Sequence, residues 1–85
     1  MRWIVEYSVG DAGHERDVVS RIVEHPGPAE AVLRENVDVE AEDWPIESID
    51  DGRGAMAANP RYEGTNYTDA WFVARTDEEP ADATV

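Results

Sequence analysis

The alternation of apolar and polar residues is clearest at the start of the chain. Over Arg2–Val9, one set of alternating positions is entirely apolar or aromatic, while the other mixes Ile4 with Glu6 and Ser8. The first set consists of Trp3, Val5, Tyr7 and Val9. Because successive side chains of a strand point to opposite faces, this pattern predicts a half-buried strand. The following segment, Gly10–Gly13, has glycines suited to a turn.

The segment Glu15–Glu24 fits two kinds of element. Its apolar residues have the spacing of an amphipathic helix, and they are Val18, Val19, Ile22 and Val23. These residues are all β-branched, however, and a tight turn after a strong strand favours a hairpin partner. We therefore favour a second strand and keep the helix as the alternative.

A helix is predicted after Pro26-Gly27-Pro28. Pro28 suits the first helical position, and Glu30 suits the positive end of the helix dipole. Asn36 can close the helix at its C-terminus. The apolar residues that share one stripe of this helix are Ala29, Val32, Leu33 and Val37. We expect a short helix of about nine or ten residues.

The second half of the chain is less regular. An acidic connection, Val37–Asp43, leads to a predicted third strand over Trp44–Asp50. Gly52–Thr68 reads as a long irregular stretch. Asp69–Thr76 is predicted as a fourth strand that is apolar on both faces, which is typical of a central strand or of one beneath an interface. Residues 77–85 are acidic, and we expect them to form a flexible tail.

These elements predict a single α+β domain over residues 1–76, in the order β-β-α-β-β. We expect two layers: a four-stranded antiparallel sheet, with one helix packed on one face. Because one helix cannot cover both faces, Ile4 and Phe72 would lie on the uncovered side. We expect a second copy of the chain to bury them there, in a homodimer.

The charge of the chain is unusual for a domain of 85 residues. It has seven arginines, no lysine and 20 acidic residues, which gives a net charge of −13. Such self-repulsion opposes the compact state in dilute buffer, but at molar salt the Debye length is only about 3 Å. This composition resembles that of proteins from salt-in halophiles; a GC-rich genome is the alternative explanation. We expect the fold to require molar salt.

Several functional classes are disfavoured by what the sequence lacks. There is no cysteine, which excludes disulfides and thiolate chemistry. No apolar run is long enough for a signal peptide or a membrane span, so we expect a soluble cytoplasmic protein without membrane contact. The sequence has no cluster of basic residues, so we expect no direct binding to nucleic acid.

The two histidines do not predict a metal site. His14 and His25 would lie about 33 Å apart along a strand, or about 16 Å apart along a helix. The chain has no Gly-x-Ser-x-Gly elbow and no glycine-rich phosphate-binding loop. We therefore predict no catalytic residue, no metal ligand and no cofactor.

The Gly52–Thr68 stretch departs from the acidic background. It contains two arginines and one acidic residue, for a local charge of +1, together with tyrosine, asparagine and glycine. We take four of its residues as candidates for contact with a partner or a small anion: Arg53, Arg61, Tyr62 and Tyr67. A flexible connection whose arginines pair with nearby carboxylates is the alternative.

The sequence therefore predicts a non-enzymatic interaction or accessory module, with another protein as a candidate partner besides its own copy. One alternative is an enzyme or binder of a small anionic ligand that uses Gly52–Thr68. A second alternative is a polyanion that mimics nucleic acid.

Overall fold

Five strands and one α-helix make up the part of the chain described by this computed structural model, residues 1–11 and 17–77. Three short 3₁₀ turns connect them: η1 (Val39–Ala41), η2 (Asp50–Gly52) and η3 (Pro60–Tyr62). The strands and the helix are β1 (Arg2–Asp11), β2 (Asp17–Glu24), α1 (Ala29–Asn36), β3 (Ile46–Ile49), β4 (Gly54–Ala58) and β5 (Tyr67–Arg75). His14 and most of the predicted tail lie outside the described residues.

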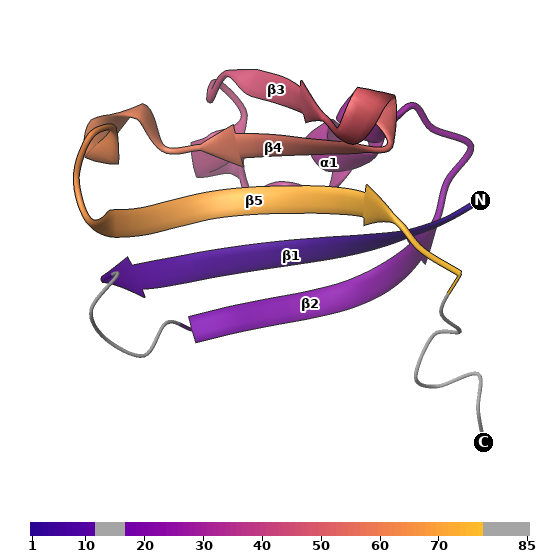
Figure 1. The fold of residues 1–85 in the computed structure, drawn as a ribbon, viewed down its shortest axis with the longest axis horizontal. Coiled ribbons are helices and arrows are strands. Elements are labelled where there is room, and N and C mark those ends of the chain that lie inside the picture. The colour runs from indigo at the N-terminus through magenta and orange to yellow at the C-terminus, as the bar shows by residue number, and fades with distance from the viewer. Residues whose placement is uncertain (12–16, 78–85) are drawn as a thin grey trace.

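The strands form one antiparallel sheet in the order β2-β1-β5-β4-β3 (Figure 1). β1 and β2 pair as neighbours, so the strand interpretation of Glu15–Glu24 is confirmed over Asp17–Glu24. β5 lies in the middle of the sheet, between β1 and β4. This central position explains why its residues are apolar on both faces.

The prediction of a four-stranded sheet is wrong, because the described residues form five strands. The missing strand, β4, lies inside Gly52–Thr68, which was predicted to be irregular, and it pairs with both β3 and β5. Its sequence, Gly-Ala-Met-Ala-Ala, is poor in the β-branched and aromatic residues that usually mark a strand. Alanine at positions 55 and 57 instead lets α1 approach the sheet closely, and both residues are buried in the core.

The helix covers one face of the sheet, as predicted, and is seen behind β4 in Figure 1. Val32 and Leu33 of α1 are completely buried against core residues of the sheet. The sheet residues of this core are Trp3, Val5, Ala55, Ala57 and Val73. Asn36 closes the helix, since its Nδ2 donates a hydrogen bond to the carbonyl oxygen of Val32 at 2.7 Å.

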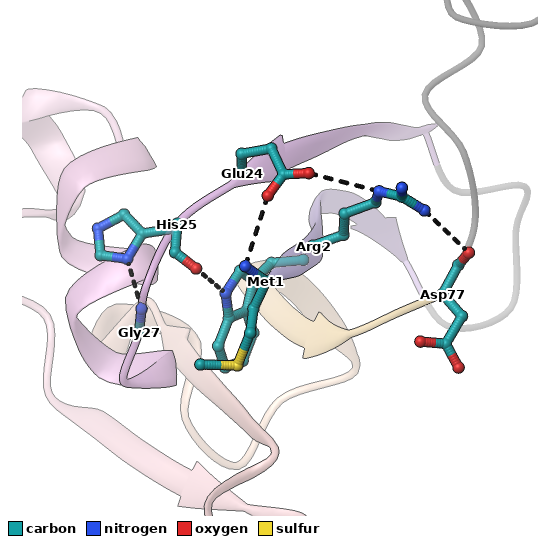
Figure 2. A network of polar contacts seen from close by, with 7 residues as sticks. Met1, Arg2, Glu24, His25, Gly27 and Asp77 are labelled. Atoms are coloured by element: carbon teal, nitrogen blue, oxygen red, sulfur yellow. Dashed lines mark hydrogen bonds and ion pairs between the residues drawn. The ribbon is translucent and has the colours of Figure 1, made fainter.

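The loop before α1 is fixed over the indole of Trp3. Trp3 Nε1 donates a hydrogen bond to the carbonyl oxygen of His25 at 2.9 Å, and His25 Nδ1 accepts one from the Gly27 amide at 2.9 Å (Figure 2). The other ring nitrogen of His25 contacts the carboxylate of Glu35. Gly27 has a φ of +88°, and a Cβ there would lie 3.1 Å from the indole. A glycine is therefore required where the chain turns into the helix.

Candidate functional site

The face of the sheet opposite α1 carries rows of side chains that run across the strands. The strand register places five residues without charge in one row: Ile22, Ile4, Ala74, Gly54 and Ile49. We call these five residues the neutral row. Ile4 and Ile22 are half-buried, and Ile49 is exposed. This row therefore presents aliphatic surface on the uncovered face.

An ion-paired group borders the neutral row at the end of the sheet (Figure 2). Arg2 Nε lies 3.4 Å from one carboxylate oxygen of Glu24, and the amino group of Met1 lies 3.4 Å from the other. Arg2 also donates a hydrogen bond to the carbonyl oxygen of Asp77 at 3.3 Å. Exposed ion pairs add little stability, but the pairing reduces the net charge beside the neutral row.

The next row is acidic at two positions. It consists of Ser20, Glu6, Phe72, Met56 and Glu47, and we call it the acidic row. Phe72 and Met56 are half-buried neighbours on β5 and β4, and a carboxylate flanks them on each side. The two apolar side chains form a ridge across the central strands.

A groove of about 410 Å³ lies beyond this ridge. Its floor contains two small residues, Ala58 and Ala70, which are directly paired between β4 and β5. The ridge side chains line one side of the groove, and Pro60 and Tyr62 from η3 line another. The volume is within the range of small ligand pockets and can hold one or two large side chains.

Hydrogen bonds from Asn59 hold the η3 wall of the groove in place. Asn59 Oδ1 accepts a hydrogen bond from the Arg61 amide at 3.0 Å, and Asn59 Nδ2 donates one to Asp69 Oδ2 at 3.0 Å. The ring of Tyr62 lies 4.4 Å from the ring of Tyr67, centroid to centroid. The wall is therefore anchored to β5 before any ligand binds.

The charges that line the groove are all negative. The acidic residues of the lining are Glu47, Glu63 and Asp69, and none of the described residues in the groove lining is basic. The carboxylate of Asp69 accepts hydrogen bonds from Asn59 and from Tyr7, the latter at 2.6 Å. Glu47 and Glu63 are exposed, so their carboxylates face solvent at the groove. This arrangement favours a cationic ligand over an anionic one.

Tyr7 supports the groove from the opposite face of the sheet. Its ring packs against Trp71 at a centroid distance of 4.8 Å, and its hydroxyl donates the hydrogen bond to Asp69. Burial and this hydrogen bond raise the pKa of Tyr7 well above its ordinary value. The phenol therefore stays protonated at neutral pH and acts as a fixed donor that orients Asp69, not as a base.

The four residues predicted from Gly52–Thr68 do not form one cluster. Tyr62 and Tyr67 are brought together in the groove lining. Arg53 precedes β4 and Arg61 follows it, so the intervening strand separates them by about 17 Å. Both arginines are exposed and neither lines the groove. They do not converge on one small anion.

Ile4 and Phe72, the predicted dimer surface, both lie on the uncovered face, in adjacent rows. Met56, Ala58 and Glu47 were not predicted as site residues, because the strand that positions the first two has no clear sequence signal. The even positions of β4 could have indicated this face, since Met56 alternates with the buried alanines at 55 and 57.

The described residues contain neither a candidate metal centre nor a candidate membrane span. No group of three or more histidine, aspartate or glutamate side chains in residues 1–11 and 17–77 could hold a metal ion. In the same part of the chain, no helix is both long enough and apolar enough to cross a membrane.

Comparisons with protein-family models, with curated proteins and with solved structures find no match for this chain. A functional proposal therefore rests on the neutral row and the groove.

Proposed function

We propose that this protein is a small, non-enzymatic interaction module that associates with a second copy of itself through the uncovered face of its sheet. One observation carries the proposal: α1 covers one face of the sheet, while the opposite face of the described chain presents the neutral row and the adjoining Phe72. Contiguous apolar surface of this kind is typical of association sites.

A second copy fits the neutral row because the row has no charge to oppose its own image. In a two-fold symmetric contact, the same patch meets itself. Ile4 and Ile22 can face their symmetry mates without bringing two carboxylates together, whereas the acidic row and the groove cannot. Phe72 lies at the border of this contact and adds aromatic surface to it.

The proposed association depends on salt. Each copy has a net charge of −13, so repulsion opposes association in dilute buffer. At molar salt the Debye length falls to about 3 Å, and burial of the aliphatic side chains then decides the outcome. We therefore place the protein in a halophile-type environment, as a soluble cytoplasmic domain.

The two alternatives from the sequence have less support. A small-anion site would need Arg53 and Arg61 together, and β4 separates them. A nucleic-acid mimic would need a line of closely spaced carboxylates. On the uncovered face, Glu6 and Glu47 are instead about 14 Å apart, across three strand spacings.

Sedimentation velocity in about 1 M KCl tests the proposal. We expect a dimer for the wild type and a monomer for Ile4→Thr/Ile22→Thr, because threonine keeps the β-branch but removes apolar surface. Val39→Thr is the matched control; Val39 is 75% exposed and belongs to η1, outside the sheet. It should remain dimeric.

Two outcomes would overturn the dimer proposal. One is a monomeric wild type with a native near-ultraviolet circular dichroism spectrum in the same salt. The other is a double variant that stays dimeric. Repeating the spectrum in about 0.1 M KCl tests the halophile proposal separately, since retention of full tertiary structure there would contradict it.

A further inference from the structure

The groove beside η3 has the shape of a receptor for one or two side chains. Its floor is set low by Ala58 and Ala70, between the Met56–Phe72 ridge and the wall at Tyr62. Small floor residues flanked by large ones leave room for an apolar side chain to be buried. The wall is already held in place by the hydrogen bonds of Asn59, so binding would require little ordering.

The charged residues around the groove favour a ligand of positive charge. Glu47 comes from β3 and Glu63 follows η3, so exposed carboxylates line the groove from two separate elements. The rings of Tyr62 and Tyr67 also line it, and aromatic faces attract guanidinium and ammonium groups. Because long-range attraction is screened at molar salt, direct contact with these carboxylates and rings is what favours a cation.

We propose that this groove binds a basic segment of a partner protein. An apolar side chain of that segment would occupy the floor over Ala58 and Ala70, and a flanking arginine or lysine would pair with Glu47 or Glu63. This inference rests on the proposed interaction function and adds the class of partner. A second copy of the chain does not suit the groove, because its lining would bring like charges together.

The groove and the neutral row therefore have different partners on the same face. The neutral row meets its own copy, because it has no charge. The groove meets a basic partner, because its lining is acidic and apolar. Phe72 belongs to the border of both surfaces, whereas Ala58 and Glu47 belong to the groove and Ile4 and Ile22 belong to the neutral row. Variants at these last four positions can thus separate the two proposals.

The test is an NMR titration of the ¹⁵N-labelled full chain with acetyl-Arg-Leu-Phe-Arg-amide. The salt is the lowest KCl concentration at which the near-ultraviolet spectrum remains native. We expect saturable shifts that are largest at Ala58, Ala70 and Glu63. Acetyl-Glu-Leu-Phe-Glu-amide reverses the charge and acetyl-Arg-Gly-Gly-Arg-amide removes the apolar side chains; each should bind at least about tenfold more weakly.

Two groove variants should weaken binding by different routes. Ala58→Leu fills the floor, and Glu47→Gln/Glu63→Gln removes both exposed carboxylates; we expect each to raise the Kd at least about tenfold. The matched control is Glu40→Gln/Glu42→Gln, which makes the same charge change at exposed positions in and beside η1. It should change the Kd by less than about twofold.

Three results would overturn the inference. These are the absence of saturable shifts at the groove, equal affinity for the charge-reversed peptide, and an equal loss of affinity in the control pair. The Ile4→Thr/Ile22→Thr variant separates this result from the dimer proposal. If it is monomeric and binds the peptide normally, both proposals are supported. A wild-type monomer that binds the peptide contradicts only the dimer, and a dimer that does not bind contradicts only the groove.

Discussion

The two faces of the sheet differ in what covers them, although the same strands build both. In β1, Val5 is 2% exposed beneath α1, whereas its neighbour Ile4 is only half-buried on the opposite face. The apolar character of the two residues is similar. Their burial differs because the helix lies on one side of the strand and the described chain supplies no second layer on the other. Alternation along a strand thus predicts two faces but does not predict which one receives a cover.

The distribution of residue size makes the same comparison more informative. On β4, the covered face has Ala55 and Ala57, and the uncovered face has Met56. Small residues lie where the helix must approach, and a larger apolar residue lies where no part of the described chain packs. The uncovered face therefore has apolar volume that the monomer's own core does not use. This favours association as the reason for that volume.

Truncation of one residue in each layer gives the largest expected contrast. Leu33 is completely buried, so Leu33→Ala should cost about 3 kcal/mol in the free energy of unfolding. Ile22→Ala, in the neutral row, should cost about 1 kcal/mol in dilute protein, because its side chain is partly in water already. Denaturant unfolding in about 1 M KCl measures both costs.

Protein concentration sharpens this first contrast. If two copies cover the neutral row, the cost of Ile22→Ala should grow as the protein concentration rises, while the cost of Leu33→Ala stays constant. Equal costs for the two variants in dilute protein would contradict the difference between the faces.

A smaller effect is expected from crowding inside the neutral row. A Cβ at Gly54 would lie 2.7 Å from the carbonyl oxygen of Val73 and 3.0 Å from Cγ1 of Ile49. Because the first contact is to backbone, Gly54→Ala should cost about 2 kcal/mol in unfolding free energy. Ala74→Ser is the control; Ala74 is exposed in the same row and should tolerate the change within about 0.5 kcal/mol.

A double variant identifies the source of the crowding. Adding Ile49→Ala removes the side-chain contact but leaves the contact with the carbonyl of Val73, so it should restore less than half of the loss. Wild-type stability for Gly54→Ala would show that the row is not packed as described.

The elements that could be predicted from the sequence are those whose own pattern of apolar and polar residues shows which faces are buried. The N-terminal strand was evident from alternation, and the central strand from apolar residues on both faces; the structure extends the first to Arg2–Asp11 and places the second at Tyr67–Arg75 instead of Asp69–Thr76. The helix was evident from its stripe and from Asn36. β4 was missed because Gly54–Ala58 is shaped by the helix that packs on it, and that contact is not local in sequence.

The failure to predict β4 also explains why only two of the four candidate residues from Gly52–Thr68 lie together. With Gly52–Thr68 taken as one loop, Arg53 and Arg61 were predicted to contact the same ligand, whereas β4 separates them. Tyr62 and Tyr67 do meet, because the backbone N–H of Asn59 donates a hydrogen bond to the carbonyl oxygen of Asp69 at 2.9 Å and closes the turn between β4 and β5 that contains η3. The groove depends on that turn and on small residues at the end of β4, neither of which has a distinctive sequence signal.

The smallest expected effect concerns Tyr7, which joins the covered face to the groove. Tyr7→Phe removes the donor to Asp69 and should cost about 1.5 kcal/mol of unfolding free energy near neutral pH. It should also weaken binding of the basic peptide only slightly, because the wall keeps its hydrogen bonds to Asn59. Denaturant unfolding measures the first effect, and the NMR titration measures the second.

The pH dependence of the same variant tests the cause of its instability. Because the folded state raises the pKa of Tyr7, it holds the phenolic proton more tightly than the unfolded chain, whose tyrosine titrates near about 10. The contribution of Tyr7 is therefore complete below about pH 10 and is lost as the pH rises toward the folded-state value. The difference in unfolding free energy between wild type and Tyr7→Phe should thus be constant below about pH 10 and shrink above it.

Asp69→Asn should flatten the decline in wild-type stability above about pH 10, since it removes the charge that disfavours tyrosinate. A difference that stays constant above about pH 10 would contradict this account, because it would mean that the folded state does not raise the pKa of Tyr7.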